Sequence, residues 1–207
     1  MLFRGLPPFQ RLLAHARPLI CPVPPLVEAV GQPQSLLDIG CGGGAILGHL
    51  LARLSPGRAL GCDINAPYVA AAARVAAAAA SARPGARYEA RLLPTPAVWP
   101  EESFECVILI DVLHHVPLEE RRALVAGAAA RVRPGGRLVI KEMDRRPWLC
   151  AMGNRLHDLV LTAEWVRYVD FPEVAAWVAA AGLRPGAFRR YRRYWYQHLL
   201  QVFHRDG

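Results

Sequence analysis

The sequence lacks an apolar run long enough to cross a membrane, because no uninterrupted stretch reaches the roughly 18–20 apolar residues that a spanning helix needs. Its first stretch, MLFRGLPPFQRLLAHARPLI, also lacks the compact apolar core and small-residue cleavage site of a signal peptide. We therefore expect a soluble, cytoplasmic protein with no transmembrane segment. Peripheral contact with a membrane stays open.

Paired cysteines are missing as well. The five cysteines are widely spaced and include no C-x-x-C pair, which argues against a zinc site, a redox motif and a disulfide framework. Free thiols suit a reducing compartment. We expect no bound metal.

Lysine is nearly absent. Lys141 is the only lysine, so the net charge of +8 is carried almost wholly by arginine. Arginine binds phosphates and carboxylates through paired hydrogen bonds. The alanine excess points equally to a GC-rich genome as the source of the arginines, so charge alone does not identify a partner.

The remaining composition is that of one globular domain. The chain has 207 residues, of which 53% are hydrophobic and 20% charged, and this excludes a disordered polymer. Residues 1–34 are rich in proline and arginine and are expected to form a helical cap, with helices near 8–16 and 24–31. Residues 35–207 are expected to form the main domain.

Apolar runs and helix-period segments alternate from residue 35 onward. We expect strands at 35–40, 58–65, 86–92, 104–111, 137–142, 186–191 and 194–203, helices at 45–54, 67–83, 118–132 and 171–183, and a turn at 133–136. The alternation predicts an α/β fold, a Rossmann-like doubly wound sheet that is mostly parallel, with helices on both faces and a ligand at the carboxyl ends of the strands.

A glycine-rich turn, D-I-G-C-G-G-G, ends the first expected strand and places four glycines in five positions, Gly40 and 42–44. Residues without a Cβ let the backbone turn sharply and approach a ligand closely. The following helix directs unpaired N–H groups at the same place. The dinucleotide fingerprint fits loosely, with Ala45 as its last position and Asp63 as the acid for a ribose. The turn predicts a cofactor site without choosing the cofactor.

Four blocks in order are more specific than the glycines: D-I-G-C-G-G-G (38–44), G-C-D-I-N (61–65), F-E-C-V-I-L-I-D-V-L-H-H-V (104–116) and R-P-G-G-R-L-V-I (133–140). On these blocks the chain resembles the class I S-adenosylmethionine-dependent methyltransferases over roughly residues 35–203. The resemblance implies S-adenosyl-L-methionine as the cofactor. It also implies that the last strand of the sheet runs antiparallel to the others.

The resemblance implies roles for the residues that bind the cofactor. Gly40, Gly42 and Gly44 would let the backbone close on its methionine part. Asp38 would orient its ammonium group, and Asp63 would accept hydrogen bonds from both ribose hydroxyls.

Further residues would line the cofactor. Ile64 would pack on the adenine, and Asp111, Val112 and Leu113 would wall the other side of the site. One departure concerns Arg91, which stands where such enzymes often carry an acid near the adenine amino group. How adenine is recognised therefore stays open.

A base is needed only if the methyl acceptor must lose a proton, as a hydroxyl must. His114 and His115 follow the fourth expected strand, where the cleft opens, and histidine can act as a base near neutral pH. D-V-L-H-H-V resembles the matching block of small-molecule and quinone-type methyltransferases, and differs from the N/D-P-P-Y/F block of enzymes that methylate exocyclic amines. One of two adjacent histidines can equally be structural.

Residues 143–170 are expected to form an insertion that covers the substrate. The segment mixes apolar and polar side chains, as a mostly apolar pocket does, and N-R-L-H-D repeats at helical spacing. Its candidate acceptor-binding residues are Asp144, Trp148, Asn154, His157 and Asp158. His157 is also a candidate base. A helix whose polar face meets water explains the same pattern.

Together these features favour a methyltransferase that acts on a small, partly apolar acceptor by O- or C-methylation, such as a lipid or polyketide-like hydroxyl. An RNA or protein methyltransferase is the alternative, because R-R-Y-R-R-Y-W-Y (189–196) could stack bases, although a hairpin with solvated arginines is favoured there. An NAD-dependent oxidoreductase explains Asp63 but not D-V-L-H-H-V. A non-catalytic binding protein leaves the polar groups of 114–158 unexplained. We expect no nucleic-acid partner and assign no oligomeric state.

Overall fold

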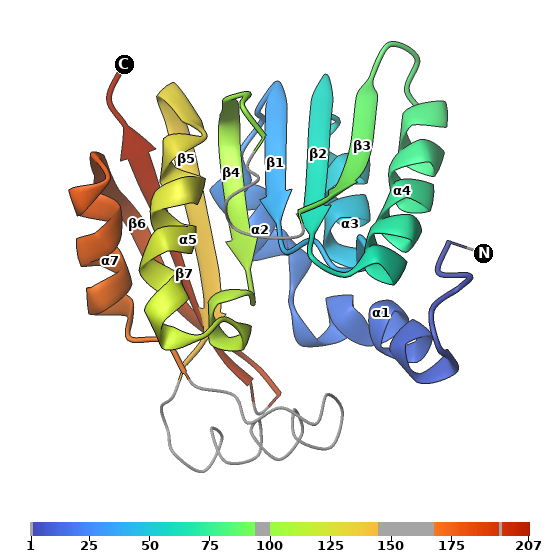
Figure 1. Ribbon diagram of the computed structural model, residues 1–207, viewed down its shortest axis with the longest axis horizontal. Helices are drawn as coiled ribbons and strands as arrows, with labels where there is room; N and C mark the ends of the chain where they lie inside the picture. The colour runs from blue at the N-terminus through green and yellow to red at the C-terminus, as the bar shows by residue number, and fades with distance from the viewer. Residues whose placement is uncertain (1, 94–99, 145–167, 195) are drawn as a thin grey trace.

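The structure is a computed structural model that describes residues 2–93, 100–144, 168–194 and 196–207. One sheet of seven strands runs through these residues (Figure 1). The strands are β1 Ser35–Ile39, β2 Arg58–Asp63, β3 Arg87–Leu92, β4 Phe104–Ile110, β5 Val132–Met143, β6 Leu183–Arg193 and β7 Tyr196–Arg205. The helices are α1 Pro8–Ile20, α2 Val23–Val30, α3 Ala45–Leu54, α4 Ala66–Ser81, α5 Leu118–Ala130 and α7 Phe171–Ala180, with a 3-10 turn η1 at Leu113–His115.

The strand order is β3-β2-β1-β4-β5-β7-β6. Strands β1 to β5 pair in parallel, whereas β7 is antiparallel to both β5 and β6. The expected fold class is therefore confirmed, including the antiparallel last strand.

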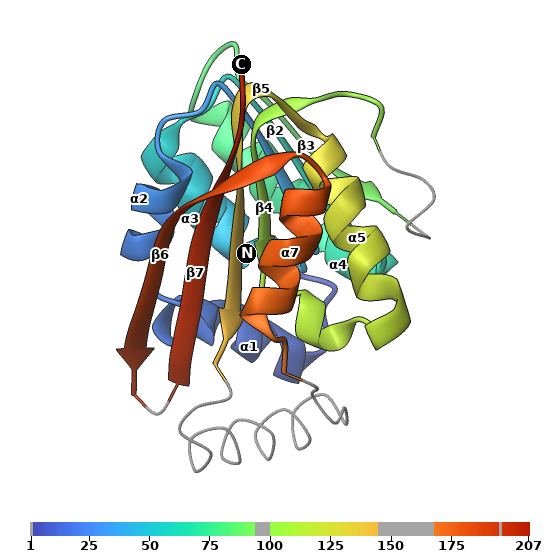
Figure 2. The ribbon, with the colours of Figure 1, turned by 90° about the vertical axis from the view of Figure 1, so that its left-hand side faces the viewer.

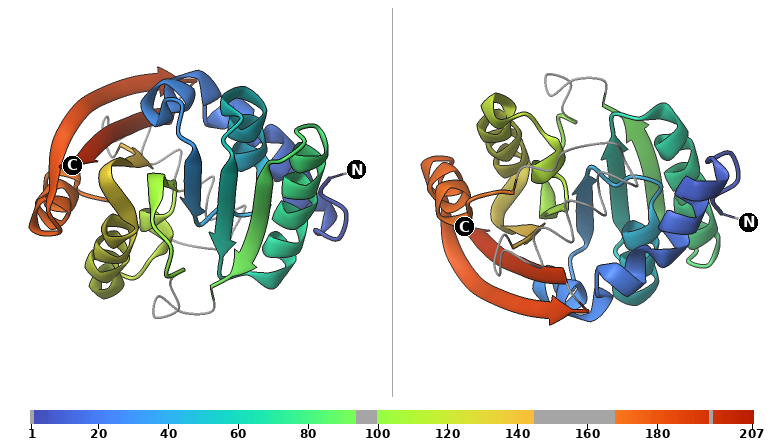
Figure 3. Two further views of the ribbon diagram at one scale, coloured as in Figure 1. Left: turned by 90° about the horizontal axis from the view of Figure 1, so that it is seen from above. Right: turned by 90° about the horizontal axis from the view of Figure 1, so that it is seen from below.

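Helices cover both faces of this sheet (Figure 3). On one face α2 and α3 pack over one hydrophobic cluster, and on the other α5 and α7 pack over a second cluster. Neighbouring residues of β1 divide between them, because side chains alternate along a strand: Leu36 joins the first cluster and Leu37 the second. Burial on both faces explains why the strands read as continuous apolar runs.

The N-terminal segment divides into two parts. Leu26 and Val30 of α2 are buried with Leu36 in the core of the sheet, so α2 is part of that packing. Helix α1 has no buried residue and lies beyond the carboxyl ends of the parallel strands (Figure 1).

The expected turn at 133–136 is wrong in one respect. The residues fall inside β5, where the pairing shifts from Phe104–Val132 to Cys106–Arg137. Gly135 has a φ of 73°, which only glycine adopts readily, so the glycine pair forms an irregularity inside the strand.

Among the described residues, no helix is long and apolar enough to cross a membrane. The loops that follow β1, β2, β4 and β5 all leave the same edge of the sheet, and this edge gathers the residues of the site.

Candidate active site

The glycine turn lies against the loop that follows β4. Gly40 has a φ of 73°, and a Cβ placed there would come within 2.5 Å of Val112. A side chain at this position would therefore push apart two loops that were both expected to contact the cofactor. Gly42, in contrast, faces open space, because a Cβ there would meet no atom within 4 Å. The turn is thus closed toward Val112 and open at Gly42.

Asp63 ends β2 and fixes the same turn. Its Oδ2 accepts the Gly42 N–H at 2.8 Å, and its Oδ1 accepts the Asn65 N–H at 2.9 Å. Each carboxylate oxygen can accept more than one hydrogen bond, so both keep acceptor capacity. Asp63 is half-buried. The neighbouring Ile64 is 74% exposed at the same edge, as a residue that packs on a flat ring would be.

Asp38 is a buried carboxylate in β1 whose side chain accepts no hydrogen bond from the described residues. Burial raises the pKa of Asp38 to about 7, and the charge of nearby Asp63 adds to this effect. A buried carboxylate is costly without a charged or hydrogen-bonding partner. Asp38 therefore fits a site that receives a cationic group, such as the ammonium of a bound amino acid.

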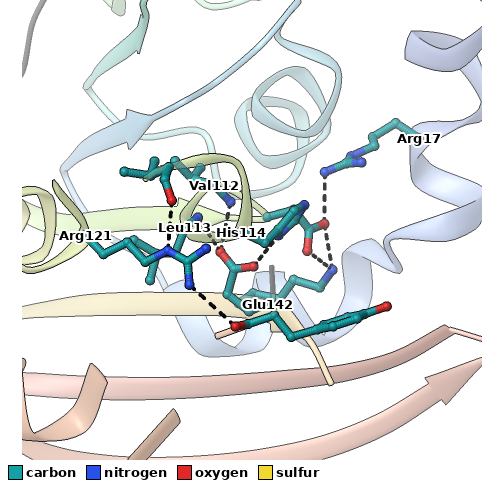
Figure 4. A network of polar contacts seen from close by, with 10 residues as sticks. Arg17, Val112, Leu113, His114, Arg121 and Glu142 are labelled. Atoms are coloured by element: carbon teal, nitrogen blue, oxygen red, sulfur yellow. Dashed lines mark hydrogen bonds and ion pairs between the residues drawn. The ribbon is translucent and has the colours of Figure 1, made fainter. Parts of the chain in front are cut away.

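Asp111, directly after β4, lies in a buried ion cluster (Figure 4). Lys141 Nζ lies 2.6 and 2.7 Å from the two carboxylate oxygens of Asp111, and Arg17 Nη2 lies 2.9 Å from Oδ2. Burial alone would raise the pKa of Asp111, but Lys141 and Arg17 hold the pKa well below its usual range. Asp111 also adopts a φ of 55°, a left-handed conformation that aspartate tolerates better than most residues.

Glu142, the next residue of β5, organises the loop after β4 (Figure 4). Its Oε1 accepts the backbone N–H groups of Val112 and Leu113 at 2.9 and 2.7 Å, and its Oε2 lies 2.5 Å from His114 Nδ1. Burial lowers the pKa of His114, but the Glu142 carboxylate outweighs burial and the net shift is upward. Three contacts to one carboxylate thus fix the imidazole and the backbone beside it.

Three of these residues have side chains that could bind a metal ion. Asp111, His114 and Glu142 each offer a ligand atom within 4.8 Å of the others. Asp111, however, is already paired with Lys141, and the two oxygens of Glu142 are already engaged by the Val112 and Leu113 N–H groups and by His114. We assign no metal to this cluster.

The two remaining predicted residues near this cluster differ in exposure. His115 is exposed, and its ring lies 4.2 Å from the ring of His114 between centroids. Asp144 is buried, and its Oδ2 lies 2.9 Å from Arg190 Nε of β6. His114 is therefore a buried histidine in direct contact with an acid, Glu142.

Four predicted residues, Trp148, Asn154, His157 and Asp158, lie outside the described residues. The same holds for most of the expected cover at 143–170. Arg91, the departure from the adenine-side pattern, lies 2.9 Å from Glu89 and 3.4 Å from Glu102, so local acids neutralise its charge.

The sequence predicted no role for Arg17 or Lys141, and it indicated Glu142 only as one of the polar groups that follow the fifth expected strand. A signal existed for two of them, because Lys141 and Glu142 form a charged pair at the end of the apolar strand R-L-V-I-K-E. Charges are rarely buried unless they are paired. Arg17 gave no such signal, since its partner is 94 residues away.

Known proteins are similar to this chain in sequence and in fold. Residues 37–138 match the family model of the methyltransferase domain. A ubiquinone biosynthesis O-methyltransferase of Xanthomonas axonopodis pv. citri (strain 306) is 30% identical over 157 residues, which are 72% of this chain and 62% of that protein. One of Bordetella avium (strain 197N) is 27% identical over 184 residues, 85% of this chain and 71% of that protein.

A solved structure gives the same result. An O-methyltransferase family protein from Burkholderia thailandensis aligns with a TM-score of 0.76 and 25% identity, over 96% of this chain and 59% of that chain. The chain belongs to the class I S-adenosylmethionine-dependent methyltransferases. Its residues 37–138 carry the methyltransferase domain of that family. It spans less than two thirds of the length of the Xanthomonas relative and of the Burkholderia structure.

Proposed function

We propose that this methyltransferase methylates a hydroxyl oxygen of a small, partly apolar acceptor, and that His114 removes the hydroxyl proton. The observation that carries the proposal is the buried contact between His114 and Glu142 beside Asp111, at the carboxyl edge of the sheet. The relatives in Xanthomonas and Bordetella are named as O-methyltransferases, which supports oxygen as the methylated atom.

Residues of the first two strands hold the cofactor in this proposal. S-adenosylmethionine supplies an electrophilic methyl group on a sulfonium, whose sulfur leaves without protonation. Asp38 pairs with the ammonium and thereby regains the partner that it lacks within the protein. Asp63 uses the spare acceptor capacity of its two oxygens for the ribose hydroxyls. The open space at Gly42 admits the methionine part, and Ile64 packs on the adenine.

His114 acts on the acceptor. Because Nδ1 faces Glu142, the proton on that nitrogen is fixed and Nε2 is the nitrogen able to accept a proton. As the acceptor oxygen takes the methyl group that the cofactor would supply, the hydroxyl proton would move to Nε2 of His114. Glu142 stabilises the resulting imidazolium through its negative charge.

The next residues concern the side of the site that would bind the methyl acceptor. Asp144 stands at its edge in contact with Arg190. We propose that Trp148, Asn154, His157 and Asp158 complete the pocket. The same segment carries Met152 and Leu156, and an apolar lining with a few polar groups would favour a partly apolar acceptor. His115 is the second candidate base of the same loop.

Binding and turnover test the proposal separately. Calorimetry should show S-adenosylhomocysteine binding and no binding of NAD. Turnover with a panel of phenolic and enolic acceptors should yield products whose new methyl group is attached to oxygen, as shown by NMR. Products methylated only on carbon or nitrogen, or on RNA or protein, would replace the proposed acceptor class while leaving the cofactor assignment in place.

A further inference from the structure

Helix α1 presents apolar side chains to solvent. Its exposed residues follow helical spacing and share one face: Pro8, Phe9, Leu12, His15 and Leu19. Phe9, Leu12 and Leu19 are 45%, 63% and 57% exposed. A helix on the surface of a domain normally turns its apolar stripe inward and its charges outward. In α1 the outward face is the apolar one.

A buried charge fixes this orientation. Arg17 leaves the opposite side of α1 and lies 2.9 Å from Asp111 in the ion cluster (Figure 4). Rotating the helix to bury Leu12 and Leu19 would withdraw Arg17 from that buried carboxylate. The outward apolar face is therefore built into the packing of α1.

The tip of the β6–β7 hairpin extends this face. Arg193 Nε donates to the backbone oxygen of Leu19 at 3.4 Å, which joins the end of β6 to the end of α1. Figure 2 shows the hairpin tip and α1 at the same end of the molecule. Arg192 and Arg193 are exposed there, and Tyr194 is 54% exposed. We call Phe9, Leu12, Leu19, Arg192, Arg193 and Tyr194 the docking surface.

The charge around the docking surface has one sign. Residues 1–27 and 174–205 contain no aspartate or glutamate, and these are the two segments that build the surface. Arginine beside exposed leucine, phenylalanine and tyrosine is the composition of helices that lie in the interface of a bilayer. Anionic lipid attracts the arginines, and the acyl boundary accepts the apolar side chains. An RNA or an acidic protein would match the arginines but leave the leucines in water.

We propose that the docking surface holds the protein on an anionic lipid bilayer. The surface lies at the carboxyl end of the strands, where the active site opens, so docking places the cleft toward the lipid. The proposal concerns binding to lipid and does not depend on which atom the enzyme methylates.

Vesicle sedimentation tests the proposal with the full chain. The probes are phosphatidylcholine vesicles with and without about 30% phosphatidylglycerol. The parent should bind the anionic vesicles, with binding that weakens as salt is raised, and should bind the neutral ones far less. The variant Leu12→Ser/Leu19→Ser should bind anionic vesicles about tenfold more weakly, because the apolar face is lost.

Two charge variants give a matched comparison. Arg192→Gln/Arg193→Gln should weaken binding to anionic vesicles by about tenfold. Arg83→Gln/Arg87→Gln removes the same charge at the opposite end of the sheet and should change binding by less than about twofold. Binding of S-adenosylhomocysteine should be unchanged in all three variants, which shows that each is folded.

Several results would overturn the proposal. Equal losses in the two arginine variants would mean that net charge alone governs binding. Unchanged binding of the leucine variant would remove the apolar face from the contact. A dimer that the leucine substitutions dissociate, seen by light scattering, would make the face an interface between copies of the chain. Binding to single-stranded RNA that is tighter than binding to vesicles would make the partner a nucleic acid.

Discussion

Lys141 is fully buried, and its ammonium group contacts both carboxylate oxygens of Asp111. The two residues come from neighbouring parallel strands, and Arg17 adds a third charge from outside the sheet. Removing one partner of a buried pair leaves an uncompensated charge.

The variant Lys141→Met should therefore lower the free energy of unfolding by about 3–5 kcal/mol, measured by urea denaturation. The double variant Lys141→Met/Asp111→Asn should be more stable than the single one, because no buried carboxylate is left without its main partner. Arg122→Met, a substitution of an exposed cation on α5, is the control and should change stability by less than about 0.5 kcal/mol. If Lys141→Met and its control lost the same stability, the cluster would not be a structural pair.

The same cluster predicts how stability depends on acid. The pKa of Asp111 is held below its usual range in the folded protein, so the carboxylate contributes stability above the unfolded-state pKa of about 3.9. That contribution is lost as the pH falls further. The acid branch of a pH–stability curve should be shallower in Asp111→Asn than in the parent below about pH 4. Parallel curves would contradict the lowered pKa.

Asp63 should decide the affinity for the cofactor. Asp63→Ala removes the charged acceptor for two ribose hydroxyls and should weaken binding of S-adenosylhomocysteine by about 1.5–3 kcal/mol in calorimetry. Glu120→Ala, which removes an exposed acid on α5, should bind like the parent. Equal affinity of Asp63→Ala and the parent would show that the ribose lies elsewhere.

Asp38 should make cofactor binding depend on pH. Because the pKa of Asp38 is raised to about 7, the carboxyl group is protonated below that pH and cannot pair with an ammonium. Affinity for S-adenosylhomocysteine should rise by up to about tenfold per pH unit below pH 7 and level off above it. Asp38→Asn should bind S-adenosylhomocysteine more weakly. Its affinity should not depend on pH between about 5.5 and 8, a range that brackets the Asp38 pKa of about 7.

The raised pKa of Asp38 has the opposite effect on folding. The unfolded chain releases this proton near pH 3.9 and the folded protein only near pH 7, so the ligand-free protein loses stability as the pH rises through that range. Asp38→Asn should remove the loss. If the free energy of unfolding of the parent increased steadily from about pH 5 to 7, the raised pKa of Asp38 would be contradicted.

Asn154 and His157 carry the prediction for the acceptor side. Alanine at either position should lower turnover of the true acceptor while S-adenosylhomocysteine binding stays nearly unchanged, because the residues are assigned to the acceptor alone. Calorimetry and initial rates measured on the same preparations separate the two effects. Weaker cofactor binding in either variant would mean that the segment does not serve the acceptor only.

The fold could be predicted from the sequence because its signals are local. The apolar runs of β1 and β4, the glycines after β1 and the Asn65 side chain that caps α4 each lie within a few residues of the structure that they specify. The irregularity at Gly135 was missed because R-P-G-G reads as a turn, whereas pairing with β4 continues on both sides of it.

The site was only half predictable for a related reason. Asp38, near the end of β1, and Asp63, the last residue of β2, were named from local pattern and stay predictions for the cofactor. Arg17, Lys141 and Glu142 act through partners far along the chain. No spacing in the sequence indicates that Glu142 would face His114 rather than solvent. The Glu142–His114 contact depends on the register between β4 and β5, in which Ile110 pairs with Lys141.

The pH dependence of turnover tests the central claim most directly. With a hydroxyl acceptor, kcat/KM of the parent should fall as the pH drops through the raised pKa of His114, above the ordinary value near 6.5. Glu142→Gln keeps an oxygen for the Val112 and Leu113 N–H groups but removes the charge, so it should shift this acid limb to lower pH and reduce the plateau. His114→Ala should lose about 10²–10⁴-fold in turnover and keep its affinity for S-adenosylhomocysteine. An acid limb that stays in place in Glu142→Gln, together with full activity of His114→Ala, would contradict the account.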